Sequence, residues 1–130
     1  MFKMSFAIYR RPDLSPEQFC DHWLNVHAPL LKKYAKALRI RRYIQLHGGD
    51  YEATRGMTEA RNCRPPHDGV VEIWWDSEED RLAAAETSAG KEASLLLRED
   101  ELRFCDMSRS SVLFGREHVI VSDGPVPSDD

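Results

Sequence analysis

The hydrophobic period of the chain changes from strand-like to helix-like, and this change constrains the fold more than any other feature of the sequence. Over residues 2–10 apolar side chains alternate with others, which predicts a β-strand. Apolar residues then recur at helical spacing along one stripe: Phe19, Trp23, Val26, Leu30 and Tyr34. Such a stripe predicts an amphipathic helix whose apolar face packs on the rest of the domain.

Capping residues mark the start of this helix and of a second one. Ser15 with Gln18, and later Ser77 with Asp80, have the spacing of a capping box. The second helical region continues in two pieces as far as residue 104. The sequence therefore predicts two helical regions, each preceded by a strand.

The remaining segments complete a recognisable order. Strands are predicted at 39–47, 70–75 and 110–121, and a long polar loop at 48–69. The order is the split β-α-β, or ferredoxin-like, βαββαβ pattern of the α+β class, with an antiparallel sheet and both helices on one face. We expect one domain over residues 1–121, followed by a loose tail over 122–130.

The predicted strands carry apolar residues on both faces. Helices on one side of the sheet leave the other side bare, and a large bare apolar face is normally covered. The simplest cover is a second copy of the chain, so we expect a homodimer with the two sheets packed face to face.

Composition argues against several classes of partner. A formal net charge of −4 is unlike the dense basic surface that nucleic acid requires. No apolar run approaches the roughly 20 residues that span a bilayer, and Arg10 and Arg11 interrupt the apolar N-terminus before any signal-peptide cleavage site. We expect a cytoplasmic protein without nucleic-acid or membrane partners.

The cysteines and histidines do not have the spacing of a metal site. Cys20, Cys63 and Cys105 form no C-x-x-C pair and are expected to be reduced thiols, of which only Cys63 lies in a polar loop. No H-x-x-x-H motif, glycine-rich phosphate loop or G-x-S-x-G motif is present. We therefore expect no metal site.

The segment HAPL at 27–30 places a histidine beside a helix-breaking proline. Pro29 has no N–H for the carbonyl of Asn25, so the helix is expected to kink or restart there. His27 lies at the edge of the apolar stripe. It is interpreted either as a core histidine bonded to the freed backbone or as a general acid or base in a pocket, and the two roles are compatible.

Three residues share one face of the second predicted strand: Tyr43, Gln45 and His47. The row is either solvated or lines a cleft opposite His27. In a cleft, Tyr43 would donate a hydrogen bond to a carbonyl or enolate oxygen, and His47 would be a second proton carrier.

Glu72 is predicted to lie between apolar neighbours in a buried strand. A buried carboxylate needs a partner, so Glu72 is expected either to pair with Arg42 or Arg116 or to serve the cleft. Trp74 and Trp75 point to opposite faces of this strand, so one is expected to wall the cleft and the other the dimer interface.

Several of these residues together resemble the EthD family, which is named after a protein encoded with an ether-degrading oxygenase system. The resemblance covers about residues 3–121. It is carried by Arg11-Pro12, Phe19, Trp23, HAPL at 27–30, Tyr43 and His47, with DGVVEIWW at 68–75 and EDELRF at 99–104 as supporting segments. The resemblance implies a dimeric α/β-barrel with a cleft between sheet and helices in each subunit.

The resemblance also implies a range of activities without metals or organic cofactors. Relatives carry out lactone isomerisation, dehydration or decarboxylation of aromatic polyketides, and cofactor-free oxygenation. We expect an isomerase or lyase of the dehydratase or decarboxylase type, acting on an aromatic or other apolar carbonyl or lactone compound by proton transfer. His27 would be the base, Tyr43 the oxyanion donor and His47 an assisting acid.

Four further residues are expected to contact the substrate: Trp23, Gln45, Glu72 and Trp75. Two alternatives remain open: a non-catalytic accessory protein that binds a hydrophobic intermediate of a degradative oxygenase pathway, and a cofactor-free monooxygenase.

Overall fold

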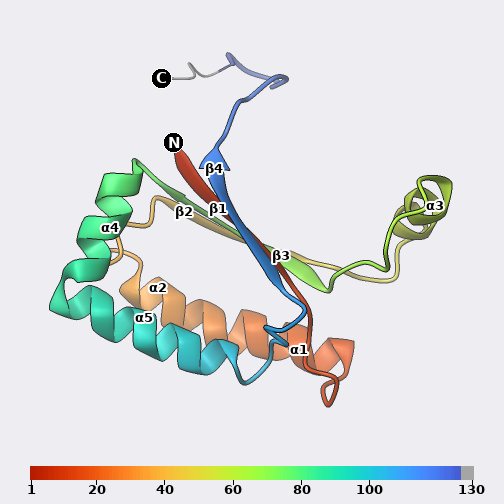
Figure 1. Cartoon of the computed structure of the whole chain (residues 1–130), viewed down its shortest axis with the longest axis horizontal. Helices are drawn as coiled ribbons and strands as arrows, with labels where there is room; N and C mark the ends of the chain where they lie inside the picture. The colour runs from red at the N-terminus through yellow and green to blue at the C-terminus, as the bar shows by residue number, and fades with distance from the viewer. Residues whose placement is uncertain (127–130) are drawn as a thin grey trace.

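A computed structural model describes residues 1–126 as one antiparallel sheet with helices on one side (Figure 1). The strands are β1 (Phe2–Ile8), β2 (Arg42–His47), β3 (Gly69–Trp75) and β4 (Ser111–Arg116), in the order β2-β3-β1-β4. Every neighbouring pair is antiparallel. This strand order confirms the predicted ferredoxin-like architecture, and it makes β2 an edge strand.

Two of the helices begin at the predicted capping residues. The helices are α1 (Pro16–His22), the π-helical turn η1 (Trp23–His27), α2 (Ala28–Tyr34), α3 (Glu52–Ala60), α4 (Glu78–Glu86) and α5 (Ser88–Glu101). Ser15 and Gln18 form the expected capping box, and the Ser77 side chain accepts from the backbone N–H of Asp80. None of the helices described here is long and apolar enough to cross a bilayer.

The strand register sorts the side chains onto two faces of the sheet. Phe2, Met4, Phe6 and Ile8 of β1 pack with the helices, where Phe19, Trp23 and Phe104 are the largest buried side chains. The intervening residues Lys3 and Ser5 lie beside Trp74 and Glu72 on the opposite, open face.

Pro29 interrupts the helix through a π turn. The N–H of Ala28 donates to the carbonyl of Trp23, five residues back, and α2 then begins. A π turn is wider than an α turn, so the phase of the apolar stripe shifts. The prediction that Val26 lies in the core is therefore wrong, since that side chain is 49% exposed. The buried residues after Phe19 instead follow at intervals of four: Trp23, His27 and Leu31.

Segment 48–69 is not the continuous loop that its polar composition predicts. It contains α3, which stands away from the sheet and the other helices (Figure 1). None of the residues of α3 is buried, and Ala53, Met57 and Ala60 share one side of it. The helix forms without core contacts, which is why a search for core-facing stripes misses it.

The ends of the strands also differ from expectation, and β1 ends at Ile8 rather than at residue 10. β2 starts at Arg42 rather than 39, because Arg39 has a positive φ of 56° in the turn after α2. β4 ends at Arg116 rather than 121, and the chain continues without regular structure as far as residue 126. The last four residues of the predicted tail, 127–130, lie outside the described residues.

Gly69 is required by the close approach of Trp23. A Cβ atom at Gly69 would lie 2.5 Å from Cζ3 of the Trp23 indole and 2.9 Å from the backbone oxygen of Leu46. Both distances are well inside van der Waals contact, so the first strand residue of β3 must lack a side chain.

We predict that Gly69→Ala lowers the free energy of unfolding by about 1–3 kcal/mol, because the methyl group overpacks this contact. Gly115→Ala in β4 is the matched control, since a Cβ there meets no atom within 4 Å. Urea unfolding monitored by circular dichroism measures both. Equal stability of the two variants would contradict the contact.

Candidate functional site

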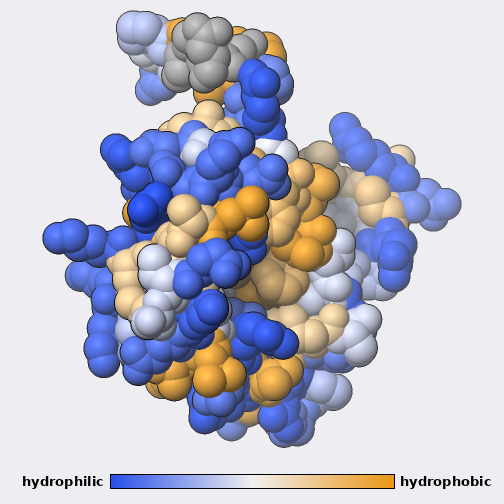
Figure 2. Space-filling view, turned by 60° about the vertical axis from the view of Figure 1, so that its left-hand side comes forward, coloured by the Kyte–Doolittle hydropathy of each residue, from blue (hydrophilic) through white to orange (hydrophobic). Residues whose placement is uncertain are grey.

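Two clefts meet at the end of β2. The first has a volume of about 800 Å³ and lies between α1, the ends of β2 and β3, and the start of α3. The second, of about 370 Å³, is lined by Leu24, Ala28, Tyr43, Gln45 and His47. His47 lines both clefts. The space-filling view shows hydrophobic side chains gathered around a hollow in the body, with α3 set apart at one side (Figure 2).

The three residues of the predicted row are joined by hydrogen bonds. Nε2 of Gln45 lies 2.9 Å from the Tyr43 hydroxyl and 3.0 Å from the carbonyl oxygen of Trp23. Oε1 of Gln45 lies 2.7 Å from Nε2 of His47. The structure thus brings the row together along one wall of the second cleft.

The partners of Gln45 determine where the protons of the row lie. The Trp23 carbonyl can only accept, so the amide nitrogen must face it and the amide oxygen must face His47. Because that oxygen is also only an acceptor, Nε2 of His47 must carry the proton and donate it. The neutral ring then has its free lone pair on Nδ1. The Tyr43 oxygen accepts from Gln45, so its own O–H remains to be donated elsewhere.

The environment keeps both ends of the row uncharged at neutral pH. Burial lowers the pKa of His47 below its ordinary value of 6.5. Burial also raises the pKa of Tyr43 above 10.0, although the N–H groups of Gln45 and Trp23 act in the opposite direction. His47 is therefore a neutral base with a defined lone pair, and Tyr43 is a neutral donor.

Trp23 supports the row from behind. Its indole stacks on the His47 ring with centroids 4.3 Å apart and planes inclined by 15°. Trp23 is 0% exposed and lines neither cleft. The structure therefore does not place this predicted substrate-contacting residue at a cleft surface. Of the predicted substrate contacts, Gln45 alone lies in the row.

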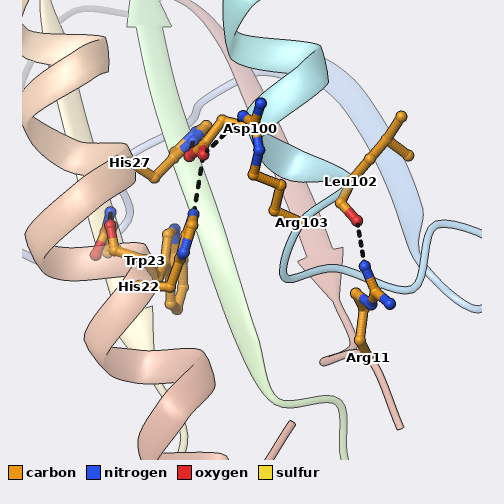
Figure 3. Close-up of polar contacts among 8 residues, drawn as sticks. Arg11, His22, Trp23, His27, Asp100, Leu102 and Arg103 are labelled. Carbon is orange, nitrogen blue, oxygen red and sulfur yellow. Dashed lines mark hydrogen bonds and ion pairs between the residues drawn. The ribbon is translucent and has the colours of Figure 1, made fainter. Parts of the chain in front are cut away.

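His27 lies in a different cluster (Figure 3). Its Nδ1 is 2.8 Å from Oδ2 of Asp100, while Nε2 of His22 is 2.9 Å from Oδ1 of the same carboxylate. Nη1 of Arg103 lies 3.3 Å from Asp100 as well. His27 is 4% exposed and lines neither cleft. Its ring nitrogen is thus held by a side chain of α5 rather than by the freed backbone of Asn25.

Asp100 is the central residue of this cluster, and sequence reasoning missed it. It is only 3% exposed, and its hydrogen bonds to the two histidines lower its pKa below the ordinary 3.8 despite burial. The one signal available was an acidic residue on the apolar side of a helix. Burial outweighs the Asp100 contact at His27 and lowers that pKa below 6.5.

Glu72 and Trp75 lie away from the row. Glu72 is on the open face of the sheet, where Nζ of Lys3 lies 2.5 Å from its carboxylate. Trp75 faces the helices, and its indole N–H donates to the carbonyl of Leu38 at 3.0 Å. Trp74 lies on the open face beneath Lys3 and Arg42.

The three thiols occupy different environments. Cys105 is buried, Cys20 is half-buried and lines the first cleft, and Cys63 is exposed. Burial raises the pKa of the Cys20 and Cys105 thiols, which disfavours their thiolate forms. Within residues 1–126, no cluster of three or more His, Cys, Asp or Glu side chains is placed to hold a metal ion.

The fold and the clefts together define a ferredoxin-like α+β protein with a site at the edge of its sheet. The EthD domain model matches residues 11–108, so the chain belongs to the EthD family. No curated protein sequence matches the chain.

Solved structures share this fold at low sequence identity. An EthD family protein from Bacillus halodurans is 20% identical, with a TM-score of 0.59, and the match covers 90% of this chain and 99% of that one. HapK from Hahella chejuensis is 15% identical over 98% and 100% of the two chains, with a TM-score of 0.57. SnoaB from Streptomyces nogalater, described as a cofactor-independent oxygenase, is 11% identical over 98% and 97%, with a TM-score of 0.51.

The buried histidine predicts a pH dependence of stability. The unfolded chain takes up a proton at residue 27 near pH 6.5, before the native protein does, so stability falls as the pH drops below that value. Glu101 acts in the opposite sense, because burial raises its pKa from 4.5 to about 7 and its contribution is lost as pH rises through that interval. The measurement therefore uses the Glu101→Gln variant.

In Glu101→Gln we expect the free energy of unfolding to decrease between pH 6.5 and pH 5, and adding His27→Gln should reduce that slope. His47, whose pKa is also lowered, accounts for a remaining part. Urea titrations at several pH values measure the slope. An unchanged slope would mean that native His27 is charged and paired with Asp100.

Proposed function

We propose that the protein is a cofactor-independent enzyme that moves a proton next to a carbonyl group of an apolar organic substrate. The observation that carries this proposal is the Gln45 amide, which fixes the His47 tautomer and leaves a free lone pair on Nδ1. Enolisation needs a base that removes a proton from carbon and a hydrogen-bond donor to the carbonyl oxygen, and a neutral histidine beside a hydroxyl group can provide both.

The proton moves between groups of this chain and the substrate. Nδ1 of His47 takes a proton from the carbon next to the carbonyl, while Tyr43 donates a hydrogen bond to the carbonyl oxygen as negative charge develops on it. Return of the proton at a different carbon is an isomerisation. Loss of a neighbouring hydroxyl group, which leaves as water with a proton returned to it, is a dehydration. In a decarboxylation His47 takes the proton of the carboxylic acid instead, loss of carbon dioxide produces the enolate beside Tyr43, and His47 returns the proton to carbon.

The lining of the first cleft favours an apolar substrate. Phe19, Leu46 and Tyr51 contribute to its wall, and His47 provides a polar group beside them. A mainly apolar concave site with a few convergent polar groups is typical of small-molecule binding. The class we propose is an aromatic or other apolar ketone, lactone or organic acid.

The role that we propose for His27 differs from proton abstraction. Its Asp100 contact ties the π turn to α5, and the same turn presents the Trp23 carbonyl to Gln45. We therefore assign the base to His47, and the predicted action of His27 on substrate remains a prediction.

Oxygenation is the second candidate. The carbanion that His47 would produce can react with dioxygen when the substrate is an electron-rich phenol or a related compound. SnoaB, which has the same fold, is described as a cofactor-independent oxygenase. Oxygen uptake with such phenols separates this candidate from simple proton transfer.

The proposal is tested by proton exchange in D2O with two probes, 2-tetralone and α-angelica lactone, followed by ¹H NMR. We expect His47→Gln to slow catalysed exchange by about 100-fold or more, and Tyr43→Phe by at least about tenfold. The controls are His118→Gln and Tyr34→Phe, which lie outside both clefts. Binding of the probes without exchange in the wild type would favour the accessory-protein alternative.

We also propose that the open face of the sheet pairs with a second copy. This face carries Leu113, which is 70% exposed, beside the Lys3–Glu72 ion pair. A similar structure from Bacteroides fragilis, 10% identical over 88% of this chain and 93% of that one with a TM-score of 0.56, is described as a dimeric protein with a ferredoxin-like fold.

Sedimentation velocity tests this pairing. We expect a dimer for the wild type and a shift towards monomer for Leu113→Asp, because the exposed Leu113 side chain would be replaced by a charge that is buried on pairing. Leu102→Asp is the control, since Leu102 is 60% exposed at the end of α5 on the helical side. A monomeric wild type would contradict the proposal.

A further inference from the structure

The indole N–H of Trp23 is an unusual group. Trp23 is 0% exposed, and its Nε1 is the one buried side-chain nitrogen or oxygen without a hydrogen-bond partner among residues 1–126. Buried donors are nearly always paired, since an unpaired one costs free energy. An unpaired donor beside a candidate site therefore calls for a functional explanation.

The packing of Trp23 determines where this N–H points. Atoms Cζ3 and Cη2, at the end of the indole away from Nε1, lie against Gly69. Gly69 is the register partner of His47, whose ring stacks on the indole. The nitrogen therefore lies at the end of the indole away from Gly69. The N–H of Trp23 acts on the Tyr43 hydroxyl by favouring its ionised form.

Two N–H groups act on the oxygen of Tyr43. Nε2 of Gln45 donates to it at 2.9 Å, and the indole N–H of Trp23 is directed to the same side. Neither group can accept a proton in return. The hydroxyl proton is left to point away from both, into the second cleft that Tyr43 lines.

We propose that Tyr43 is a general acid that transfers its proton to the substrate, and that the Trp23 indole N–H donates a hydrogen bond to the phenolate that this transfer leaves. The inference rests on the proposed function and deepens it. His47 Nδ1 takes the proton from carbon, Tyr43 gives its proton to the carbonyl oxygen, and an enol forms. The imidazolium and the phenolate return to neutrality when the enol proton goes back to Tyr43 and His47 protonates a carbon.

Other groups around Tyr43 keep it protonated at rest. Burial disfavours the phenolate most, and the carboxylate of Glu101 on α5, when ionised, acts in the same direction by its negative charge. Two N–H donors oppose these effects. The phenol therefore holds its proton until a substrate oxygen accepts it, and the phenolate is stabilised only while it is needed.

The test needs no substrate. Biosynthetic incorporation of 3,5-difluorotyrosine lowers the ionisation range of every tyrosine, and ¹⁹F NMR then follows each titration, with Tyr43→Phe assigning the signal. We expect Trp23→Phe to raise the midpoint of Tyr43 by about one pH unit or more, because a donor to the charged form is lost. Trp74→Phe is the matched control, since the Trp74 N–H is bonded to Glu117 on the opposite face of the sheet.

A second measurement covers the case in which Trp23→Phe does not fold. In the fluorotyrosine-labelled protein with no tryptophan replaced, the ¹H signal of the Trp23 indole should move downfield with the same midpoint as Tyr43. An indole signal that does not move through this titration, or a midpoint unchanged in folded Trp23→Phe, would overturn the inference. If the indole signal follows Tyr43 but Tyr43→Phe exchanges the carbonyl probes at the wild-type rate, the contact between the indole and the Tyr43 phenolate stands, while the general-acid role of Tyr43 and its part in the proposed function both fail.

Discussion

The hydrogen bond from Gln45 to the carbonyl of Trp23 is the interaction on which the rest of the site depends. A backbone carbonyl cannot donate, so this contact orients the amide, and the amide then decides which nitrogen of His47 holds the proton and which side of Tyr43 is left to donate. A single backbone acceptor thus sets three proton positions. The acceptor belongs to the π turn that precedes Pro29, so a proline that disturbs a helix is linked to the chemistry of a strand facing it.

The histidine of the HAPL segment stabilises that arrangement by connecting the same turn to α5. His22 and His27 both contact the one carboxylate of Asp100, which joins the helical segment 16–27 to α5. A fully buried carboxylate would be costly alone, but with two imidazole donors and Arg103 it remains ionised. The cluster fixes the position of the π turn relative to the second layer of helices. His27 thus contacts Asp100 of α5, while His47 stacks on Trp23 of the π turn.

The fold and part of the site could be predicted from the sequence because they depend on local periodicity. The two-residue period of β2 places Tyr43, Gln45 and His47 on one face, and that face lines a cleft. Val26 was assigned to the core wrongly, since a regular helix was assumed where the π turn shifts the phase. Asp100 could not be found, because its partner His27 lies 73 residues earlier and no spacing rule joins them. The role of Gly69 likewise depends on a ring from a distant helix. Periodicity and spacing rules do not predict which side chains of distant elements come into contact.

The excursion between β2 and β3 is closed at its base. The N–H of Gly48 donates to the carbonyl of Asp68 at 2.9 Å, and Asp68 is itself bonded to the backbone N–H of Arg10. The sheet is therefore complete without anything between these two residues, while Tyr51 and Thr54 of the excursion contribute to the wall of the first cleft. Lengthening, shortening or replacing this segment would remodel the wall without disturbing the row on β2. The shape of the cleft entrance and the position of the row on β2 are thus set by separate parts of the chain.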